Sequence, residues 1–296
     1  MFHIQCWENT TINMLESLIS IFQYQFVLHA LIAAVLASIS CGIVGTYIVA
    51  RRKVFISGGI THASFGGIGI GYYLGINPVL GAAIFSILSA LGIEYISKKT
   101  DVREDSAIGI LWSLGMAIGI IFIFITPGYA PNLMMFLFGN ILTVTWFDIC
   151  LLMGLCLLIV TFFWAYYRLI LYISFDEDYA RAHRAPVNFI NYLLMSIVAL
   201  TIVLNIRVVG IILVISFLTI PQTTANLYSR DFRTIIFLSI LIGLIGSMAG
   251  LFMSYSLDIP SGASIIFAFV ILFILAKAER FVQQKRKMRR NLKMTD

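Results

Sequence analysis

Charge is scarce in this sequence. Asp, Glu, Lys and Arg together make up 11% of its 296 residues, whereas hydrophobic residues make up 60%. A soluble domain carries about 25% charged residues, so the composition excludes a water-soluble globular protein and predicts a polytopic membrane protein. Each crossing of the bilayer takes about 20 residues, which leaves no length for a large soluble domain. We therefore expect an all-α fold in which residues 1–296 form a single membrane domain.

Several catalytic and metal-binding motifs are also missing. The four cysteines occur in no CxxC or similar pairing, so we interpret them as buried thiols. The chain has no G-x-x-x-x-G-K-[ST] phosphate-binding loop and cannot hydrolyse ATP by that route. H-E-x-x-H and G-x-S-x-G are absent, and no carboxylates cluster at one membrane depth. A membrane hydrolase or a proton-driven antiporter is therefore poorly supported, and we expect no catalytic residues.

Long apolar runs predict about nine membrane-spanning helices within residues 26–278. They cover residues 27–50, 55–75, 79–97, 106–126, 147–167, 189–206, 208–227, 233–256 and 262–278. The apolar run from Leu133 to Val144 is too short to span, and we predict a re-entrant or interfacial piece there. Residues 1–25 have apolar positions at helical spacing opposite polar ones, which predicts an amphipathic helix on the membrane surface.

The basic residues are distributed unevenly over the predicted loops. In a nine-helix arrangement, all of the 20 Lys and Arg residues except Arg207 fall in or at the edges of alternate loops, or in or just before the tail, residues 279–296. Because Lys and Arg accumulate in cytoplasmic loops, this pattern predicts an external N-terminus and a cytoplasmic C-terminus. The net charge of +6 is then a feature of membrane topology. We expect the tail to contact anionic membrane lipid, and nucleic acid is not an expected partner.

A glycine-rich segment, FISGGITHASFGGIGIGYYLG, covers residues 55–75 and contains a histidine in mid-span. Gly67, Gly71 and Gly75 are spaced as a ridge of small residues, which predicts a helix buried against its neighbours. An ionisable residue inside the membrane is a functional candidate, and imidazole is a common metal ligand. We therefore predict that His62, with Thr61 beside it, lies on a metal or translocation pathway. The alternative is that His62 only packs against a facing helix.

Two further features could belong to a pathway. Asp258 lies between the last two predicted spans, where it could attract or release a cation together with Ser261, or could instead cap the next helix. Pro221 interrupts the seventh span and leaves a carbonyl one turn earlier without its usual donor. Neighbouring polar side chains, including Gln222, could satisfy that carbonyl or line a polar path. A plain kink at Pro221 is the simpler interpretation.

The longest basic loop contains the run FDEDYARAHRAP at residues 175–186. Acidic residues come first, basic residues follow and a proline ends the run, which is the order that stabilises a short helix. We predict a short surface helix that docks into a partner protein, and a solvated loop helix is the alternative. The candidate contact residues are Asp176, Glu177, Tyr179, Ala180, Arg181 and His183.

Four stretches resemble one family, the ZnuB-like membrane permeases of bacterial ATP-binding cassette (ABC) importers for zinc, manganese and iron. The first is GGITHASFGGIGIGYYLG after Arg51 and Arg52, which is similar to the family's Gly-Asp-x-x-Ser-His-Ala segment. The others are REDSAIGILWSLGMAIG with the later LFGNIL, FDEDYARAHRAPV with VVGIILVISFLTIPQTTA, and DIPSGASIIFAFVILFIL. The last is close to the family's Leu-x-x-Pro-Ser-Gly signature. Together they extend from about Leu36 to about Leu275, in the family's order.

The resemblance implies a transport subunit in the bacterial inner membrane rather than an enzyme. It implies a homodimer around a central pathway, a cytoplasmic ATPase subunit that uses ATP, and an extracytoplasmic metal-binding protein that delivers the ion. It also implies that residues 175–186 are the coupling helix that docks in a groove of the ATPase.

One position departs from the family pattern. Many relatives have Asp four residues before the histidine, whereas this chain has Gly58. Loss of this carboxylate leaves imidazole, which suits zinc better than manganese, so we expect zinc as the transported ion. Import of manganese or iron is the alternative within the family. An ATP-independent metal channel or carrier and a non-transporting scaffold are alternatives outside it.

Overall fold

The chain folds into a helical bundle. A computed structural model describes residues 25–127, 139 and 141–292, and no strand occurs among them. In this part of the chain, eight helices are long and apolar enough to span a membrane, which confirms the all-α membrane class. They are α2 (Gln25–Ala50), α3 (Val54–Tyr73), α4 (Pro78–Lys99), α5 (Glu104–Ile125), α7 (Trp146–Ala165), α10 (Val187–Val209), α13 (Phe232–Leu257) and α14 (Ser261–Leu292).

The predicted seventh span is broken into two short helices, α11 (Ile211–Phe217) and α12 (Ile220–Ala225). Pro221 lies in the first turn of α12, where its missing N–H costs nothing. The Gln222 side chain donates to the carbonyl of Phe217 at 3.0 Å and to that of Cys41 on α2 at 2.8 Å. Gln222 thus satisfies the carbonyl that the proline leaves free, and it fastens the break to α2.

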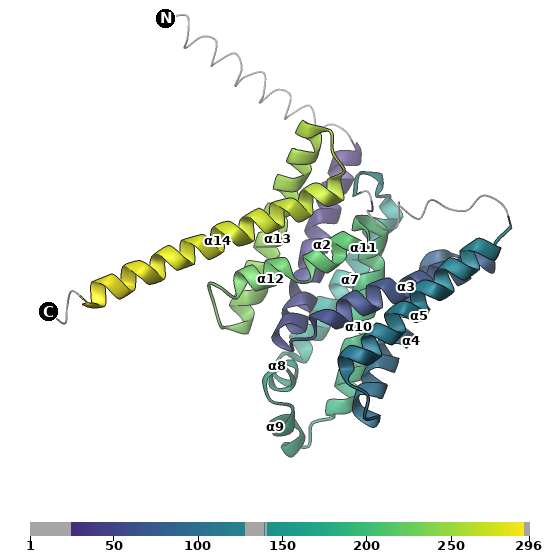
Figure 1. Cartoon of the computed structure of the whole chain (residues 1–296), viewed down its shortest axis with the longest axis horizontal. Helices are drawn as coiled ribbons and strands as arrows, with labels where there is room; N and C mark the ends of the chain where they lie inside the picture. The colour runs from purple at the N-terminus through teal and green to yellow at the C-terminus, as the bar shows by residue number, and fades with distance from the viewer. Residues whose placement is uncertain (1–24, 128–138, 140, 293–296) are drawn as a thin grey trace, which may run out of the picture.

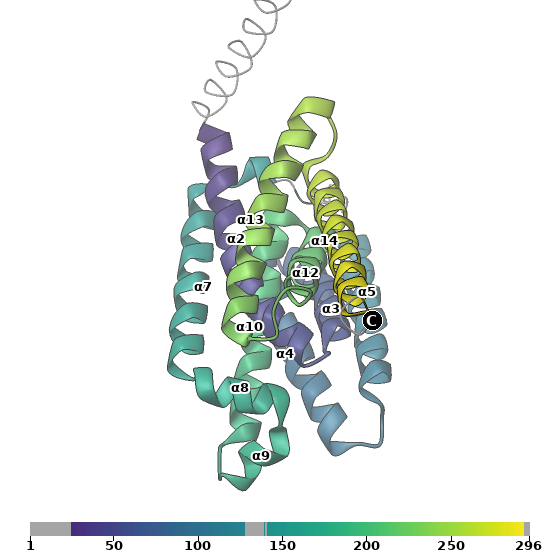
Figure 2. The same cartoon turned by 90° about the vertical axis from the view of Figure 1, so that its left-hand side faces the viewer.

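Short helices join the long ones at the membrane surface. After α7 the chain turns at Tyr166 into α8 (Tyr167–Phe175), which lies across the end of the bundle and leads to α9 (Glu177–Ala182) (Figure 2). The described part of the predicted piece 133–144 contains one turn of 3-10 helix, η1 (Ile141–Thr143). The amphipathic helix predicted for residues 1–25 lies outside the described residues, apart from Gln25, which begins α2.

Glycines bring α3 close to its neighbours, and α3 is the most deeply buried of the eight spans. A Cβ at Gly67 would overlap the backbone of Gly81 on α4, and a Cβ at Gly71 would overlap Pro78. Gly75 is different, because a Cβ there would meet nothing and its φ of +67° is left-handed. The prediction that Gly75 belongs to the packing ridge was wrong, since it follows the end of α3 and turns the chain.

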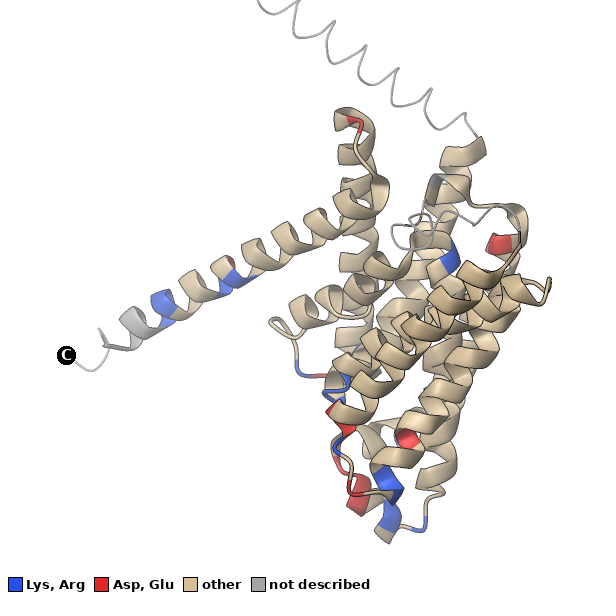
Figure 3. Ribbon diagram, turned by 45° about the vertical axis from the view of Figure 1, so that its right-hand side comes forward, with Lys and Arg blue, Asp and Glu red and all other residues tan. Residues whose placement is uncertain are grey.

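The elements form two visible groups in Figure 1: α3, α4 and α5 run side by side, and α13 packs against the first part of α14, which crosses it obliquely. The predicted last span and the basic tail are one continuous helix as far as Leu292, and α14 extends diagonally away from the bundle. Apart from α14, most charged residues gather at the end of the bundle that carries α9 (Figure 3). We call this the basic end.

Candidate translocation and coupling sites

His62 lies on α3 against α5. Its ring stacks on that of Trp112, with centroids 4.2 Å apart and an interplanar angle of 9°. The imidazole is half-buried, and its Nδ1 atom is shielded from solvent without a hydrogen-bond partner in the part of the chain that the structure describes. A buried nitrogen without a partner costs free energy. This arrangement leaves a nitrogen lone pair or N–H available for another ligand.

The other residues of the predicted pathway do not join His62. Thr61 is fully buried, and its hydroxyl donates to the carbonyl of Ser57 one turn earlier on α3. Within residues 25–127, 139 and 141–292, no hydrogen bond, ion pair or ring contact joins His62 to Asp258 or Ser261. No group of three His, Cys, Asp or Glu side chains that could hold a metal ion occurs there either. Within the described part of a single chain, the imidazole of His62 therefore belongs to no such group of metal ligands.

Gly58 lies one turn before His62 on the same face. A Cβ at Gly58 would meet the Trp112 ring at 3.5 Å, which is ordinary van der Waals contact. Packing therefore does not force glycine at this position. The absence of a carboxylate beside His62 is a property of the sequence and not a steric requirement of the fold.

Asp258 ends α13 with a left-handed backbone, φ +54°. Its side chain is exposed and has no hydrogen bond or ion pair to any described residue. Ser261 begins α14 and is buried, while the Pro260 carbonyl accepts the N–H of Ser264. Asp258 is therefore the C-cap residue of α13, through its backbone N–H, and its side chain does not cap α14. The carboxylate is free of hydrogen bonds and ion pairs with the described residues at this end of the bundle.

Helix α9 has two distinct faces. Asp176 caps it by accepting the N–H of Tyr179 at 2.8 Å, while Glu177 and Ala180 face the bundle, with Ala180 fully buried. Tyr179, Arg181 and His183 are exposed. The predicted surface helix is therefore present, although it is shorter than expected. Of the six predicted contact residues, Asp176 caps the helix, two anchor it on the bundle, and the three exposed ones are available to a partner.

Glu177 attaches α9 to the membrane helices. Its Oε2 accepts from Arg51 at the end of α2 at 2.8 Å, and its Oε1 accepts from Arg181 at 2.6 Å and from Asn191 on α10 at 3.4 Å. Lys98 of α4 lies 3.9 Å from Oε1. Burial opposes ionisation of Glu177, but the hydrogen bonds from Arg51 and Arg181 outweigh it and lower the pKa of the carboxyl to about 2. Glu177 therefore stays charged at neutral pH.

A second set of ion pairs continues this network. Glu94 of α4 is buried, and it pairs with Lys53 at 3.2 Å and with Lys98 at 2.7 Å. Lys53 also pairs with Glu104 at the start of α5, at 3.3 Å. The ends of α2, α3, α4 and α5 are thus connected to α9 through charged side chains. The sequence pattern does not predict this network, because only two of its ion pairs, one at Glu94 and one at Glu177, join residues four positions apart, and the others join segments far apart in the chain.

At the opposite end, Arg207 is the basic residue that departs from the charge pattern. It forms an ion pair with Asp148, and its guanidinium carbon lies 5.6 Å from the ring centroid of Phe147. Asp148 also forms a capping box with Thr145 at the start of α7. Arg207 is therefore neutralised locally and is compatible with the non-basic end of the bundle.

Comparison with known proteins identifies the family. Residues 23–280 match the model described as the ABC 3 transport family. The chain belongs to this family. It is 36% identical over 256 residues to the manganese transport system membrane protein MntC of Halalkalibacterium halodurans, covering 86% of this chain and 88% of the relative. It is 34% identical over 276 residues to the manganese import system permease protein ScaB of Streptococcus gordonii, covering 92% and 99%.

A solved structure agrees with this assignment. PsaBC from Streptococcus pneumoniae in complex with Fab has a chain that superposes with a TM-score of 0.80 and 35% identity, covering 89% of this chain and 95% of that one. This chain is therefore a membrane permease of a metal-importing ABC system and not an enzyme. ATP is hydrolysed by a separate partner subunit. The family assignment replaces the alternatives of an ATP-independent channel or carrier and of a non-transporting scaffold.

Proposed function

We propose that this permease carries manganese ions into the cell. The observation that carries the proposal is its similarity, over nearly the whole chain, to two permeases named for manganese transport. Our expectation of zinc, which rested on Gly58 and on the softness of imidazole, stays a prediction. Zinc is the second candidate because His62 presents a nitrogen with no carboxylate beside it, a ligand that suits zinc.

Direct uptake of each ion separates the two candidates. Competition alone is ambiguous, because zinc binds most nitrogen and oxygen sites more tightly than manganese without necessarily being transported. Radioactive manganese and radioactive zinc are therefore supplied separately to a strain that lacks its own importers and expresses this system. Manganese accumulation above the empty-vector control, with zinc at background, is the expected result. The reverse pattern would assign the permease to zinc.

The role of His62 is tested in the same strain. His62→Ala removes the imidazole, whereas His62→Phe keeps a ring that can stack on Trp112 but cannot bind a metal ion. We expect both variants to lose uptake at equal expression. Uptake restored by His62→Phe would reduce His62 to a packing residue. Gly58→Asp places its Cβ in ordinary van der Waals contact with Trp112, and it is expected to raise manganese uptake relative to zinc uptake, since it adds a hard oxygen ligand.

We propose that α9 is the coupling helix that docks into the partner ATPase. Tyr179, Arg181 and His183 form its exposed face, with the rings of Tyr179 and His183 4.2 Å apart. Glu177 and Ala180 form the opposite face against the bundle. A movement of the ATPase would then pass through Glu177 to the ends of α2, α4 and α10. This arrangement supports a mechanical connection between ATP hydrolysis and the membrane helices.

We also propose that two copies of the chain form the pathway. A single imidazole is a poor site for a divalent ion, whereas a two-fold axis would supply a second His62. The basic end, with α9, would face the cytoplasm beside the ATPase. The other end, with Asp258 and Ser261, would receive the ion from an extracytoplasmic binding protein. The distribution of Lys and Arg supports this orientation in a bacterial inner membrane.

A further inference from the structure

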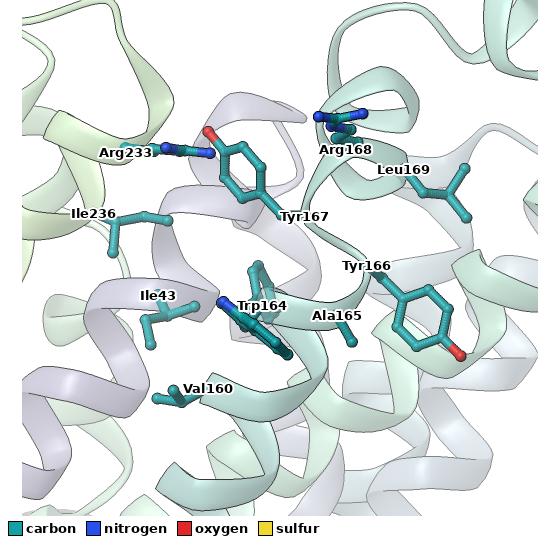
Figure 4. A pocket seen from close by; sticks show the side chains of 11 residues that line it. Ile43, Val160, Trp164, Ala165, Tyr166, Tyr167, Arg168, Leu169, Arg233 and Ile236 are labelled. Atoms are coloured by element: carbon teal, nitrogen blue, oxygen red, sulfur yellow. The ribbon is translucent and has the colours of Figure 1, made fainter.

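A cavity of about 630 Å³ opens on the side of the bundle where α7 turns into α8. Residues of α2, α7, α8 and α13 line it, and Figure 4 shows their side chains. Its apolar part is formed by Ile43, Val160 and Ile236. Its polar part carries two arginines, Arg168 and Arg233. Neither the transport pathway nor the coupling face of α9 includes these residues.

The length of α7 fixes the depth of this cavity in the membrane. Helix α7 has 20 residues, which at about 1.5 Å per residue spans the hydrocarbon core of about 30 Å. Trp164, Tyr166 and Tyr167 therefore lie at the boundary with the lipid headgroups, where aromatic side chains concentrate. Helix α8 then runs across the bundle instead of continuing α7 (Figure 2). This depth would place the two arginines at the level of the lipid phosphate groups.

Among the described residues, the arginines of the cavity form no ion pair, and no carboxylate lines it. Arg168 and Arg233 are exposed, and neither forms an ion pair within the part of the chain that the structure describes. Asp231, two residues before Arg233, accepts both the N–H and the hydroxyl of Thr234, at 2.9 and 2.8 Å, and caps α13. Its charge acts on Arg233 from the solvent side, outside the cavity lining. The Arg233 guanidinium carbon lies 4.6 Å from the ring centroid of Tyr167. This contact holds Arg233 over the cavity without neutralising it (Figure 4).

We propose that this cavity binds an anionic phospholipid. The phosphate would be held by Arg168 and Arg233, since guanidinium groups bind phosphate through paired hydrogen bonds. One acyl chain would lie along Ile43, Val160 and Ile236. A zwitterionic phospholipid, whose headgroup adds an ammonium group, fits less well, because the described residues that line the cavity include two arginines and no carboxylate. The bound lipid would connect α8 to α13. Helix α8 directly precedes α9 in the chain. This inference requires only that the chain spans a bilayer.

The test uses the purified full-length permease, with lipid binding followed by native mass spectrometry. Phosphatidylglycerol and phosphatidylethanolamine are titrated against the wild type and against a variant carrying Arg168→Ala and Arg233→Ala. Each basic residue near an anionic surface contributes about 1 kcal/mol, so we expect phosphatidylglycerol to bind the double variant about 30-fold more weakly. Arg230→Ala, an exposed arginine outside the cavity, is the matched control and is expected to bind normally.

Several results would overturn the proposal. Equal phosphatidylglycerol affinity in the wild type and the double variant would show that the arginines do not hold the lipid. Displacement of the lipid by millimolar inorganic phosphate would indicate a general anion site. A disulfide formed between two copies that carry Trp164→Cys in a cysteine-free background would assign this face to a subunit interface. If the double alanine variant does not fold, Arg168→Lys with Arg233→Lys keeps the charge but loses the paired hydrogen bonds, and intermediate affinity is then expected.

Discussion

Replacement of Glu177 by Gln tests how α9 is attached to the bundle. The variant keeps the shape of the side chain but removes the charge that three cations surround. Arg51 is affected most, because its side chain is 14% exposed and its other hydrogen bond, at 2.6 Å, goes to the carbonyl of Ile173. Glutamine still accepts a hydrogen bond, so the variant isolates the ionic part of the interaction.

The size of the effect follows from the burial of each partner. A hydrogen bond to a charged group contributes about 1.5–3 kcal/mol, whereas an exposed ion pair contributes about 0.2–1 kcal/mol. The pair with Arg51 belongs to the first class, and the pair with Arg181, which is 45% exposed, belongs to the second. We expect Glu177→Gln to weaken docking of α9 on the bundle by about 2 kcal/mol, which is about 30-fold in the docking equilibrium.

The assay compares transport with ATP hydrolysis in proteoliposomes that contain the complete importer. We expect Glu177→Gln to lower the number of ions transported per ATP several-fold, while ATP hydrolysis stays within about twofold of wild type. Asp178→Asn makes the same charge change at the next residue, which is exposed and has no ion pair among the described residues. It is the matched control and is expected to transport normally. A wild-type ratio of transport to hydrolysis in Glu177→Gln would refute the proposed connection.

Three further predictions concern stability, measured as Tm of the purified permease. The pKa of Glu177 is lowered to about 2 in the folded state and is about 4.3 when unfolded. The contribution of the Glu177 charge to the stability of the folded state is therefore complete above about pH 4.3 and is lost as pH falls toward 2. A Tm difference between wild type and Glu177→Gln that shrinks already at neutral pH would contradict this. Gly67→Val would force a Cβ into the Gly81 backbone and is expected to abolish folding. Gly109→Ala is the control and is expected to be tolerated, because its Cβ would meet nothing within 4 Å. A normal Tm for Gly67→Val would refute the close packing of α3 on α4. Gln222→Leu leaves the buried Phe217 carbonyl without a donor and removes a second hydrogen bond, to the Cys41 carbonyl, so we expect it to destabilise by about 2–4 kcal/mol. An unchanged Tm would show that the helix break does not depend on this side chain.

Hydropathy was sufficient to predict the long helices. The apolar run expected at 189–206 is helix Val187–Val209, and that expected at 55–75 is helix Val54–Tyr73. The position of Gly75 was misjudged because the spacing of glycines does not show where a helix ends. Gly75 has a left-handed backbone just past that end. Local spacing therefore predicts which residues can pack closely, while the helix terminus decides which of them do.

The candidate sites were predicted less completely, for a physical reason. The acid-before-base order of residues 175–186 predicted a helix, and Asp176 does cap it. That order could not show that Glu177 faces Arg51, because the two residues are 126 positions apart in the chain. Similarly, Arg168 and Arg233 belong to different helices and share a cavity only in the folded chain. Contacts between distant segments depend on helix packing, and one sequence alone does not determine it.

The most direct test of the account is ATP-driven manganese uptake by the reconstituted importer. Proteoliposomes containing this permease, its partner ATPase and the metal-binding protein are supplied with radioactive manganese, with ATP either present or absent on the side of the basic end. We expect manganese to accumulate on the ATP side only when ATP can be hydrolysed, and to stop accumulating when His62→Ala replaces the wild type. Uptake that proceeds equally without ATP, or that occurs for zinc and not for manganese, would contradict the account.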